Sequence, residues 1–382
     1  MARRGSLSRP GEIPTVLLRG CFRILLLYDV AEAIDLATLR QLLGSRAGPA
    51  RGVFPRRTPE YVRFEEPPLI EPIERVTLST GEQADCSLKY YSFAAVVLQL
   101  EVAFECTWET LLTRASRWIG IADVEPQARE LVRSHLDRVA PAIIRPNKDW
   151  LEEDYLLINL QHAAEGENQQ PTAVELLSAH GREIAQVIRG ELAPLAPHLY
   201  DSVLEASMSY YPSDLVVVGS SAALVYDRSE DADATNQVLE YAKMQLLEFR
   251  YYDGLMTRLL SDVYTALERK RNILFSRWSL PREAKGFNTI RLDVMELTER
   301  IDNAIKFVSD IYYARVYRLA ATRMGVPEYR SLVDEKLRTA GGLYDSMIDQ
   351  FNEARTFILE VGLTVLALFD VILFLILLLR GG

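Results

Sequence analysis

The sequence is poor in the residues that build metal and redox sites. Its 382 residues include only three cysteines and four histidines. Cys21, Cys86 and Cys106 have no paired spacing, which excludes a disulfide scaffold and a zinc site of the paired-cysteine type. The four histidines lie too far apart along the chain to indicate a metal site. We therefore expect no metal ion and no cofactor.

Sequence motifs of the common enzyme classes are also missing. The chain has no GxxxxGK[ST] phosphate loop, no GxGxxG, no HExxH and no GxSxG. No residue is therefore predicted to be catalytic, and we expect a protein that is not an enzyme. The alternative is an enzyme whose site is assembled from distant residues of the N-terminal body, in a polar pocket between residues 90 and 225.

Lysine is scarce, and positive charge is unevenly placed. The chain has seven lysines against 36 arginines, and its net charge is −10. Residues 1–63 nevertheless hold 11 arginines against five acidic residues. A basic N-terminal arm, residues 1–18, is expected to be solvated, although such an arm can also meet RNA, anionic lipid or an acidic partner. Because no basic motif interleaved with aromatic residues is present, direct nucleic-acid binding is not expected.

Residues 19–228 combine short apolar segments with amphipathic ones, which predicts an α+β body with an antiparallel or mixed sheet. The expected strands are Arg19–Asp29, Tyr61–Phe64, Ile73–Leu78, Leu88–Tyr91, Ala94–Phe104, Tyr155–Leu160, Ala206–Tyr210, Leu215–Val218 and Ala222–Tyr226. The expected helices are Leu36–Leu43, Trp108–Ile119, Pro126–Val139 and Ala173–Ile188.

Residues 233–355 lack strand signals and predict a long helical hairpin, or stalk, with coiled-coil-like packing. Apolar residues recur there at spacings of three and four, interrupted at Asp253. The loop Ser279–Asn288 is expected to join two antiparallel helices. Packing within one chain and contact between subunits both remain open. The seam comprises Leu239, Leu246, Phe249, Leu260, Val263, Leu267, Ile301 and Val308.

The last segment, residues 356–380, predicts a single transmembrane helix. Val361–Leu379 is 19 residues long with one charge, Asp370, and a helix of about 20 residues spans the hydrocarbon core of a bilayer. Fifteen of the 19 residues are Leu, Ile, Phe or Val. Each contributes about −0.3 to −0.6 kcal/mol to the free energy of membrane insertion, whereas a central Asp costs about +2.5 to +3.5 kcal/mol. Insertion into the lipid bilayer is therefore favoured.

One stripe of this helix carries small and polar residues. Glu360, Thr364, Ala367 and Asp370 fall within about a third of the helix circumference. Helices associate in lipid through such residues, and acids inside membranes usually face a partner or a cavity. We interpret the stripe as the seam of a homo-oligomer. The alternative is that Asp370 is tolerated on a face toward lipid without function.

The position of the span indicates how the chain is oriented. It lies at the C-terminus, and the first residues contain Pro10 and Pro14 where a signal peptide has its apolar core. We expect a tail anchor that leaves the N-terminal body in the cytoplasm, with the bacterial inner membrane as the expected location. In an organelle the body would lie on the matrix side.

Motifs along the chain resemble a known family. The C-terminal part of the chain is similar to the tail of the "required for meiotic nuclear division" family. The similar residues are Leu343-Tyr344-Asp345, Asn352–Arg355 and Leu359-Glu360, followed by Asp370 ten residues after Glu360. That family includes a mitochondrial translation-associated protein and YagE-like bacterial members. Here Asp370 replaces the usual second Glu, and the chain resembles a divergent bacterial branch.

Earlier segments are similar to the same family in the same order. Tyr28–Glu32 resembles its early strand-to-helix element, Tyr91–Leu98 its "YGVVVFWG" strand, and Gln245–Asp253 its "YLEI-x-QR" helix. The Gly and Trp of the second motif are missing. The resemblance implies an oligomeric, membrane-anchored protein whose body is not an enzyme.

The combined expectation is a membrane-anchored scaffold or tether that oligomerises through its helices and recruits a cytoplasmic protein partner. A second possibility is an oligomeric ion-conducting or transport protein with Asp370 near the pore. CorA-type channels are a poor match, because they need two spans and a GMN loop.

Overall fold

The computed structural model describes residues 17–49, 67–120, 124–161, 171–227, 229–269 and 311–380. These residues divide into two compact units. Unit 1 holds the described residues up to Tyr251 together with 311–329, and unit 2 holds 252–269 and 330–380. The predicted strand Tyr61–Phe64, the loop Ser279–Asn288 and the seam residues Ile301 and Val308 lie outside the described residues.

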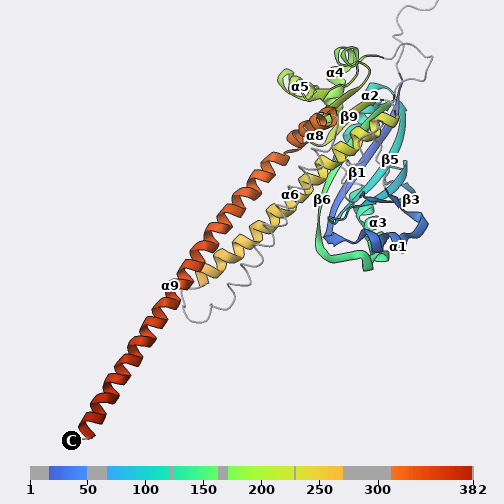
Figure 1. The fold of residues 1–382 in the computed structure, drawn as a ribbon. Coiled ribbons are helices and arrows are strands. Elements are labelled where there is room, and N and C mark those ends of the chain that lie inside the picture. Colours follow the sequence, from blue (N-terminus) through green and yellow to red (C-terminus); the bar gives the residue numbers. More distant parts are fainter. Residues whose placement is uncertain are drawn as a thin grey trace, which may run out of the picture. The chain divides into compact units, whose positions relative to one another are not determined.

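A mixed β-sheet is the centre of unit 1 (Figure 1). The described strands lie in the order β2-β3-β4-β5-β1-β6-β9-β8-β7. Among the described strands only β6 and β9 pair in parallel, and every other neighbouring pair is antiparallel. The strands are β1 Leu18–Ile34, β2 Gly48–Pro49, β3 Leu69–Thr77, β4 Gln83–Tyr90, β5 Ala95–Cys106, β6 Ile143–Gln161, β7 Ser207–Met208, β8 Leu215–Val218 and β9 Ala222–Asp227.

Strand β1 is buried on both faces, which explains its nearly continuous apolar sequence. Phe22, Ile24 and Leu26 point into the main hydrophobic core. That core is completed by helices α1 Leu36–Leu43, α2 Trp108–Trp118, α3 Glu125–Arg138 and α4 Ala173–Arg189. Leu25 and Leu27, whose side chains alternate to the opposite face, are also fully buried.

Local signals begin and end the helices of unit 1. The Asp35 side chain accepts hydrogen bonds from the first turn of α1, and Thr172 with Glu175 forms a capping box at α4. Gly190, in a left-handed conformation, ends α4. The remaining short helices are α5 Pro197–Leu204 and the 3₁₀ turns η1 Gly44–Arg46 and η2 Ala140–Ala142.

Helix α6, Ser229–Arg269, lies across the sheet face that the first helices leave uncovered (Figure 1). The face assignment rests on side-chain contacts: Asp233 and Glu240 of α6 pair with Arg23 of β1 and Lys89 of β4. Helix α8, Ile311–Met324, also belongs to unit 1, and its Tyr317 hydroxyl donates a hydrogen bond to Gln245 of α6. The first half of α6 is therefore part of the packed body.

In unit 2, α6 continues beside α9, Val326–Arg380. Met256 of α6 and Val333 of α9 are fully buried. Lys336 Nζ lies 2.5 Å from Asp253 Oδ1 and donates to Thr257 Oγ1 at 2.6 Å. Asp253, which interrupts the apolar spacing in the sequence, thus has a charged partner on the neighbouring helix.

The structure confirms the α+β class and a sheet of mixed direction. Within the described ranges, no helix combines the length and apolarity required to cross a membrane. The apolar segment Val361–Leu379 lies within α9, but many of its side chains are outside the described set. The predicted transmembrane helix therefore stays a prediction.

Two elements differ most from the sequence expectation. Strand β6 begins at Ile143, well before the predicted Tyr155, because its polar first half pairs with β1 through Ile34↔Ile143 and Asp29↔Leu151. Helix α5 was not predicted, since its segment opens at two closely spaced prolines, Pro194 and Pro197, and has little periodicity. In both places pairing or packing with distant residues overrides weak local signals.

Candidate functional site

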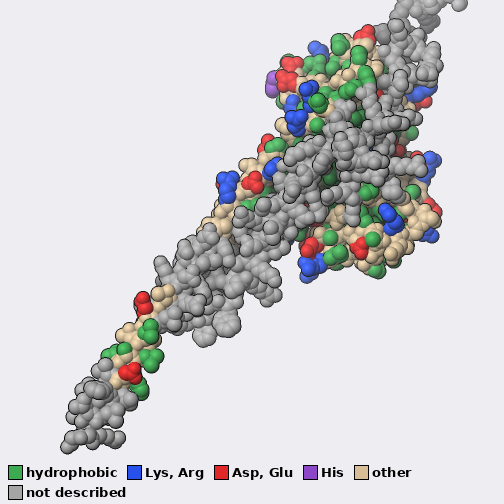
Figure 2. Space-filling model, viewed as in Figure 1, with side chains coloured by type: hydrophobic (Ala, Val, Ile, Leu, Met, Phe, Trp, Pro, Cys, Tyr) green, Lys and Arg blue, Asp and Glu red, His purple; other side chains and the backbone are tan. Residues whose placement is uncertain are grey.

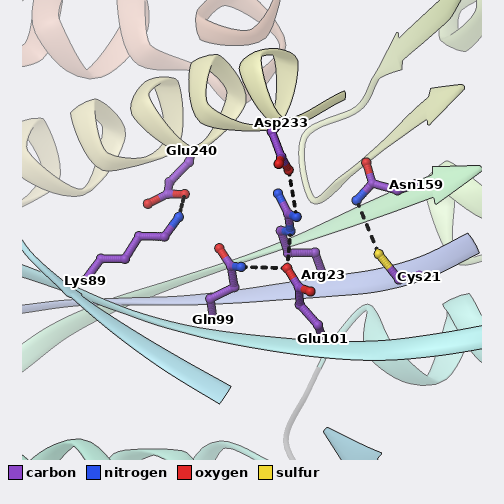
Figure 3. A network of polar contacts seen from close by, with 8 residues as sticks. All are labelled: Cys21, Arg23, Lys89, Gln99, Glu101, Asn159, Asp233 and Glu240. Atoms are coloured by element: carbon purple, nitrogen blue, oxygen red, sulfur yellow. Dashed lines mark hydrogen bonds and ion pairs between the residues drawn. The ribbon is translucent and has the colours of Figure 1, made fainter. Parts of the chain in front are cut away.

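The most distinctive chemical feature of unit 1 is a layer of charged side chains between the sheet and α6 (Figure 3). Arg23 on β1 is central to it. Its Nε donates to Glu101 Oε1 at 2.8 Å, and its Nη2 donates to Asp233 Oδ1 on α6 at 2.9 Å. Gln99 Nε2 donates to the same Glu101 oxygen at 2.8 Å. Arg23 and Glu101 are direct cross-strand partners, so the sheet register places them together.

The ion pairs keep Arg23 charged in this layer. Burial alone would lower its pKa, but the carboxylates of Glu101 and Asp233 outweigh this effect and raise it. Beside Arg23, Asn159 Nδ2 lies 3.8 Å from the Cys21 sulfur. Burial raises the pKa of the Cys21 thiol, so this thiol is protonated at neutral pH and is a weak nucleophile.

A second pairing connects β4 to α6. Lys89 Nζ lies 2.5 Å from Glu240 Oε2, and the Tyr91 hydroxyl donates to Glu240 Oε1 at 2.8 Å. The Glu240 side chain is only 3% exposed and the Lys89 side chain 15%. Since a buried carboxylate without partners is costly, these two donors are what allow Glu240 to lie beneath the helix.

A third group lies where α6 crosses β6. Glu153 pairs with Lys243, whose Nζ is 2.5 Å from Oε2, and with Arg250. Burial lowers the pKa of Lys243 to about 8, opposed by the negative charge of Asp154. Glu153 and Lys243 are both less than a tenth exposed. The first half of α6 is thus attached to β4 and β6 by buried ion pairs and to β1 by a partly exposed one.

Two carboxyl groups in this layer form no ion pair with any residue that the structure describes. Asp29 on β1 and Glu248 on α6 are 3% and 5% exposed. Burial raises the pKa of Asp29 to about 7. Burial, and then the nearby charge of Asp29, raises the pKa of Glu248 well above its usual range. Asn147 Nδ2 donates to Asp29 Oδ2 at 3.2 Å.

The opposite face of the sheet holds two smaller polar clusters. Buried Glu71 accepts hydrogen bonds from the Tyr90 hydroxyl at 2.6 Å and from Arg138 at 2.9 Å. Glu152 forms a carboxyl–carboxyl hydrogen bond with Glu125, and burial together with this contact raises the pKa of Glu152 to about 7. In the described part of the chain, no group of three or more His, Cys, Asp or Glu side chains is arranged to hold a metal ion.

The structure places the predicted seam residues in different surroundings. Leu239, Leu246 and Phe249 are buried within unit 1, and Leu260 is half-buried in unit 2. The side chains of Val263 and Leu267 are outside the described set. Along α9 the stripe residues are all exposed in the single chain: Glu360, Thr364, Ala367 and Asp370.

Sequence reasoning missed the charged layer, although α6 carries a signal for it. Asp233, Asn236, Glu240 and Lys243 recur at spacings of three and four, alongside the apolar series Leu239, Ala242, Leu246 and Phe249. Both series are buried apart from partly exposed Asp233. A helix with parallel polar and apolar stripes indicates burial on two sides, with charged residues on the surface that it covers.

Fold and charged layer together define an α+β body in which a long helix is held on a mixed sheet by buried ion pairs. The chain belongs to the family described as "Uncharacterized protein MJ0711, N-terminal domain", whose model matches residues 19–233. That range covers the described strands except Leu18, the first residue of β1, and ends in the first turns of α6.

One curated relative is the "Uncharacterized protein MJ0711" of Methanocaldococcus jannaschii, 20% identical over 190 residues. The aligned region covers 50% of this chain and 58% of that protein, so the chain spans little more than half of the relative's length. No solved structure matches the chain.

Proposed function

We propose that this protein is a membrane tether: its body lies in the cytoplasm, and Val361–Leu379 of α9 inserts into the lipid bilayer. The observation that carries the proposal is the surface of α9 near its end. Every described residue from Glu360 to Asp370 is exposed, as is Ile372. Leu363, Leu366 and Phe369 are at least 60% exposed, and hydrophobic side chains follow this stretch in Figure 2.

This exposure favours a nonaqueous environment for the helix. Burying one large apolar side chain is worth about 1.5–3 kcal/mol, and here such side chains project in several directions around the helix. A protein groove covers one face of a helix, whereas lipid covers all of them. The uniformly apolar sequence of Val361–Leu379 supports the same environment.

Tethering, rather than catalysis, is supported by the chemistry of the described side chains. Burial raises the pKa of Cys86 to about 12 and also raises the pKa of Cys106, so the thiols do not supply a nucleophile. The buried charges of the layer are used to join α6 to the sheet. We propose that the body recruits a cytoplasmic protein partner and that α6 and α9 connect it to the bilayer.

Lysines in the apolar segment test the anchor. In the variant Leu363→Lys, Leu366→Lys, Phe369→Lys and Ile372→Lys, each substitution adds about 2.5–3.5 kcal/mol to the insertion free energy. We expect the wild-type chain to remain in the membrane pellet after alkaline carbonate extraction and the variant to move to the supernatant. A control with Leu363→Ile, Leu366→Ile, Phe369→Leu and Ile372→Leu should behave as wild type. Wild-type protein in the supernatant would refute the anchor.

The stripe Glu360, Thr364, Ala367 and Asp370 is proposed as the seam between copies. In one chain the Thr364 hydroxyl donates to the Glu360 carbonyl at 2.7 Å, and the Asp370 side chain is exposed. We expect Asp370→Leu to reduce the mass of the detergent-solubilised oligomer, measured by native mass spectrometry, and Asp370→Asn to preserve it through hydrogen bonding. An unchanged mass for Asp370→Leu contradicts the seam.

A further inference from the structure

The carboxyl groups of Asp29 and Glu248 occupy a special position in the charged layer beneath α6. Asp29 lies on β1, in the centre of the sheet, and Glu248 lies on the helix that covers it. Both are more than nine-tenths buried, and the charge of Asp29 acts on Glu248. One carboxyl therefore belongs to each side of the same interface.

The cations around this pair are already engaged. Lys243 and Arg250 pair with Glu153, and Lys89 pairs with Glu240. Arg23, further along β1, pairs with Glu101 and Asp233. Among the described residues, no Lys, Arg or His forms a hydrogen bond or an ion pair with either carboxyl group.

The other polar groups of the interface supply little compensation. Asn147 of β6 gives Asp29 one hydrogen bond, and Glu248 Oε1 has no hydrogen-bond partner among the described residues. The Tyr91 hydroxyl is directed to Glu240, and the Tyr317 hydroxyl of α8 is directed to Gln245. Asp154 of β6 adds a further negative charge near Lys243. The interface thus has more carboxyl groups than cations to pair with them.

We propose that Asp29 and Glu248 form a proton-operated latch that holds the first half of α6 on the sheet and releases it when they ionise. With protons bound, the two groups are neutral and compatible with burial. When both lose their protons, two adjacent buried charges without cations favour the state in which α6 lifts and water reaches them.

The sign of the pH dependence follows from where the protons are held. Burial raises the pKa of Asp29 to about 7, and the same cause raises the pKa of Glu248 well above its usual range. In the released state both carboxyls ionise near pH 4. The docked state therefore binds more protons than the released state. The stability that these protons give the docked state is lost as the pH rises from about 4 through 7 and above.

The latch gives the proposed tether a regulation, since α6 continues from the body into unit 2. Only this biological role of the latch rests on the proposed function. The docking equilibrium is a property of unit 1, so it is measurable even if the C-terminal segment does not insert into lipid. A failure of the anchor and a failure of the latch are thus separate results.

Tryptic cleavage after Lys243 and Arg250 tests the latch in the full chain in detergent. Each rate is divided by that of a synthetic peptide of residues 238–255 at the same pH, which removes the pH dependence of trypsin. Between pH 6.5 and 8.5 we expect the normalised rate to rise about tenfold or more in the wild type, because Asp29 crosses its pKa of about 7 and Glu248, whose pKa is raised well above its usual range, adds to the rise. Cleavage after Arg138 should stay slow, which excludes global unfolding.

Matched variants assign the effect to the two carboxyls. In Asp29→Asn with Glu248→Gln neither of the two side chains ionises, so the normalised rate should not rise over this range. Because burial lowers the pKa of Lys243 to about 8, that lysine favours the docked state as the pH rises. Glu109→Gln, at an exposed carboxyl of α2, should keep the wild-type rise. If the double variant does not fold, Glu248→Gln alone should show a smaller rise than wild type. A flat wild-type profile, or an equal rise in a folded double variant, overturns the latch.

Discussion

Replacing Glu240 by leucine is expected to lower the free energy of unfolding by about 3–5 kcal/mol. The substitution leaves the Lys89 ammonium and the Tyr91 hydroxyl, both largely buried, without their common acceptor. Unpaired buried donors lose their interaction with water and gain nothing in return. Urea unfolding of the full chain in detergent, followed by circular dichroism, measures the change.

A double-mutant cycle separates the pair from the packing of the side chains. Lys89→Met combined with Glu240→Leu removes both charges, and we expect it to recover at least half of the stability lost in Glu240→Leu. Asp85→Ala, which breaks the exposed pair with Arg75, should have no measurable effect. Additive effects of the two buried substitutions would show that Lys89 and Glu240 do not interact.

Gly20→Ala is the other substitution with a large expected effect. A Cβ atom at Gly20 would overlap the backbone carbonyl oxygen of Asn159 on β6 and come within 2.8 Å of the Phe104 ring on β5. A ring can turn aside, but a backbone carbonyl moves only if the strands separate. We expect a loss of about 3 kcal/mol or more in the free energy of unfolding, at the upper end for overpacking.

A second glycine provides the control for this prediction. Gly254, in α6, has no atom within 4 Å of the position where a Cβ would lie. Gly254→Ala should therefore stabilise the helix, by about 0.5–1 kcal/mol. A Gly20→Ala variant as stable as the wild type would mean that β1 and β6 are not as close as the structure places them.

The body was largely predictable because its strands and helices have strong local patterns. The apolar run Arg19–Asp29 predicts the central strand, and α1 and β8 begin and end at the residues expected from the sequence. The polar half of β6 was not predictable. Pro146, Asn147 and Lys148 favour a loop by themselves. Pro146 pairs with Ala31 of β1, and Asn147 and Lys148 lie in the irregular stretch before the pairing resumes at Leu151.

The charged layer was less predictable than the fold, since it depends on residues far apart in the sequence. Lys89 and Glu240 are 151 positions apart, and Arg23 and Asp233 are separated by 210. Their pairing requires the position of α6 across the sheet, which no local pattern provides. The arginine within the apolar β1 segment and the polar stripe of α6 are each visible alone, but neither identifies its partner.

The apolar series of α6 illustrates how one pattern fits two structures. Leu239, Leu246 and Phe249 have the spacing of a coiled coil, and in the structure they pack within the body. A helix that lies on a sheet and beside a second helix needs the same spacing as one in a coiled coil. The pattern therefore predicts a buried stripe without specifying what covers it.

Hydrogen exchange along α6 tests most directly whether its first half belongs to the body. At pH 6, with the full chain in detergent, we expect amides of residues 232–249 to exchange as slowly as those of β1 residues 22–29, because both lie in one packed unit. Exchange of residues 232–249 at least a hundredfold faster than that of β1, with β1 still protected, would show that α6 is not held on the sheet and would contradict the account.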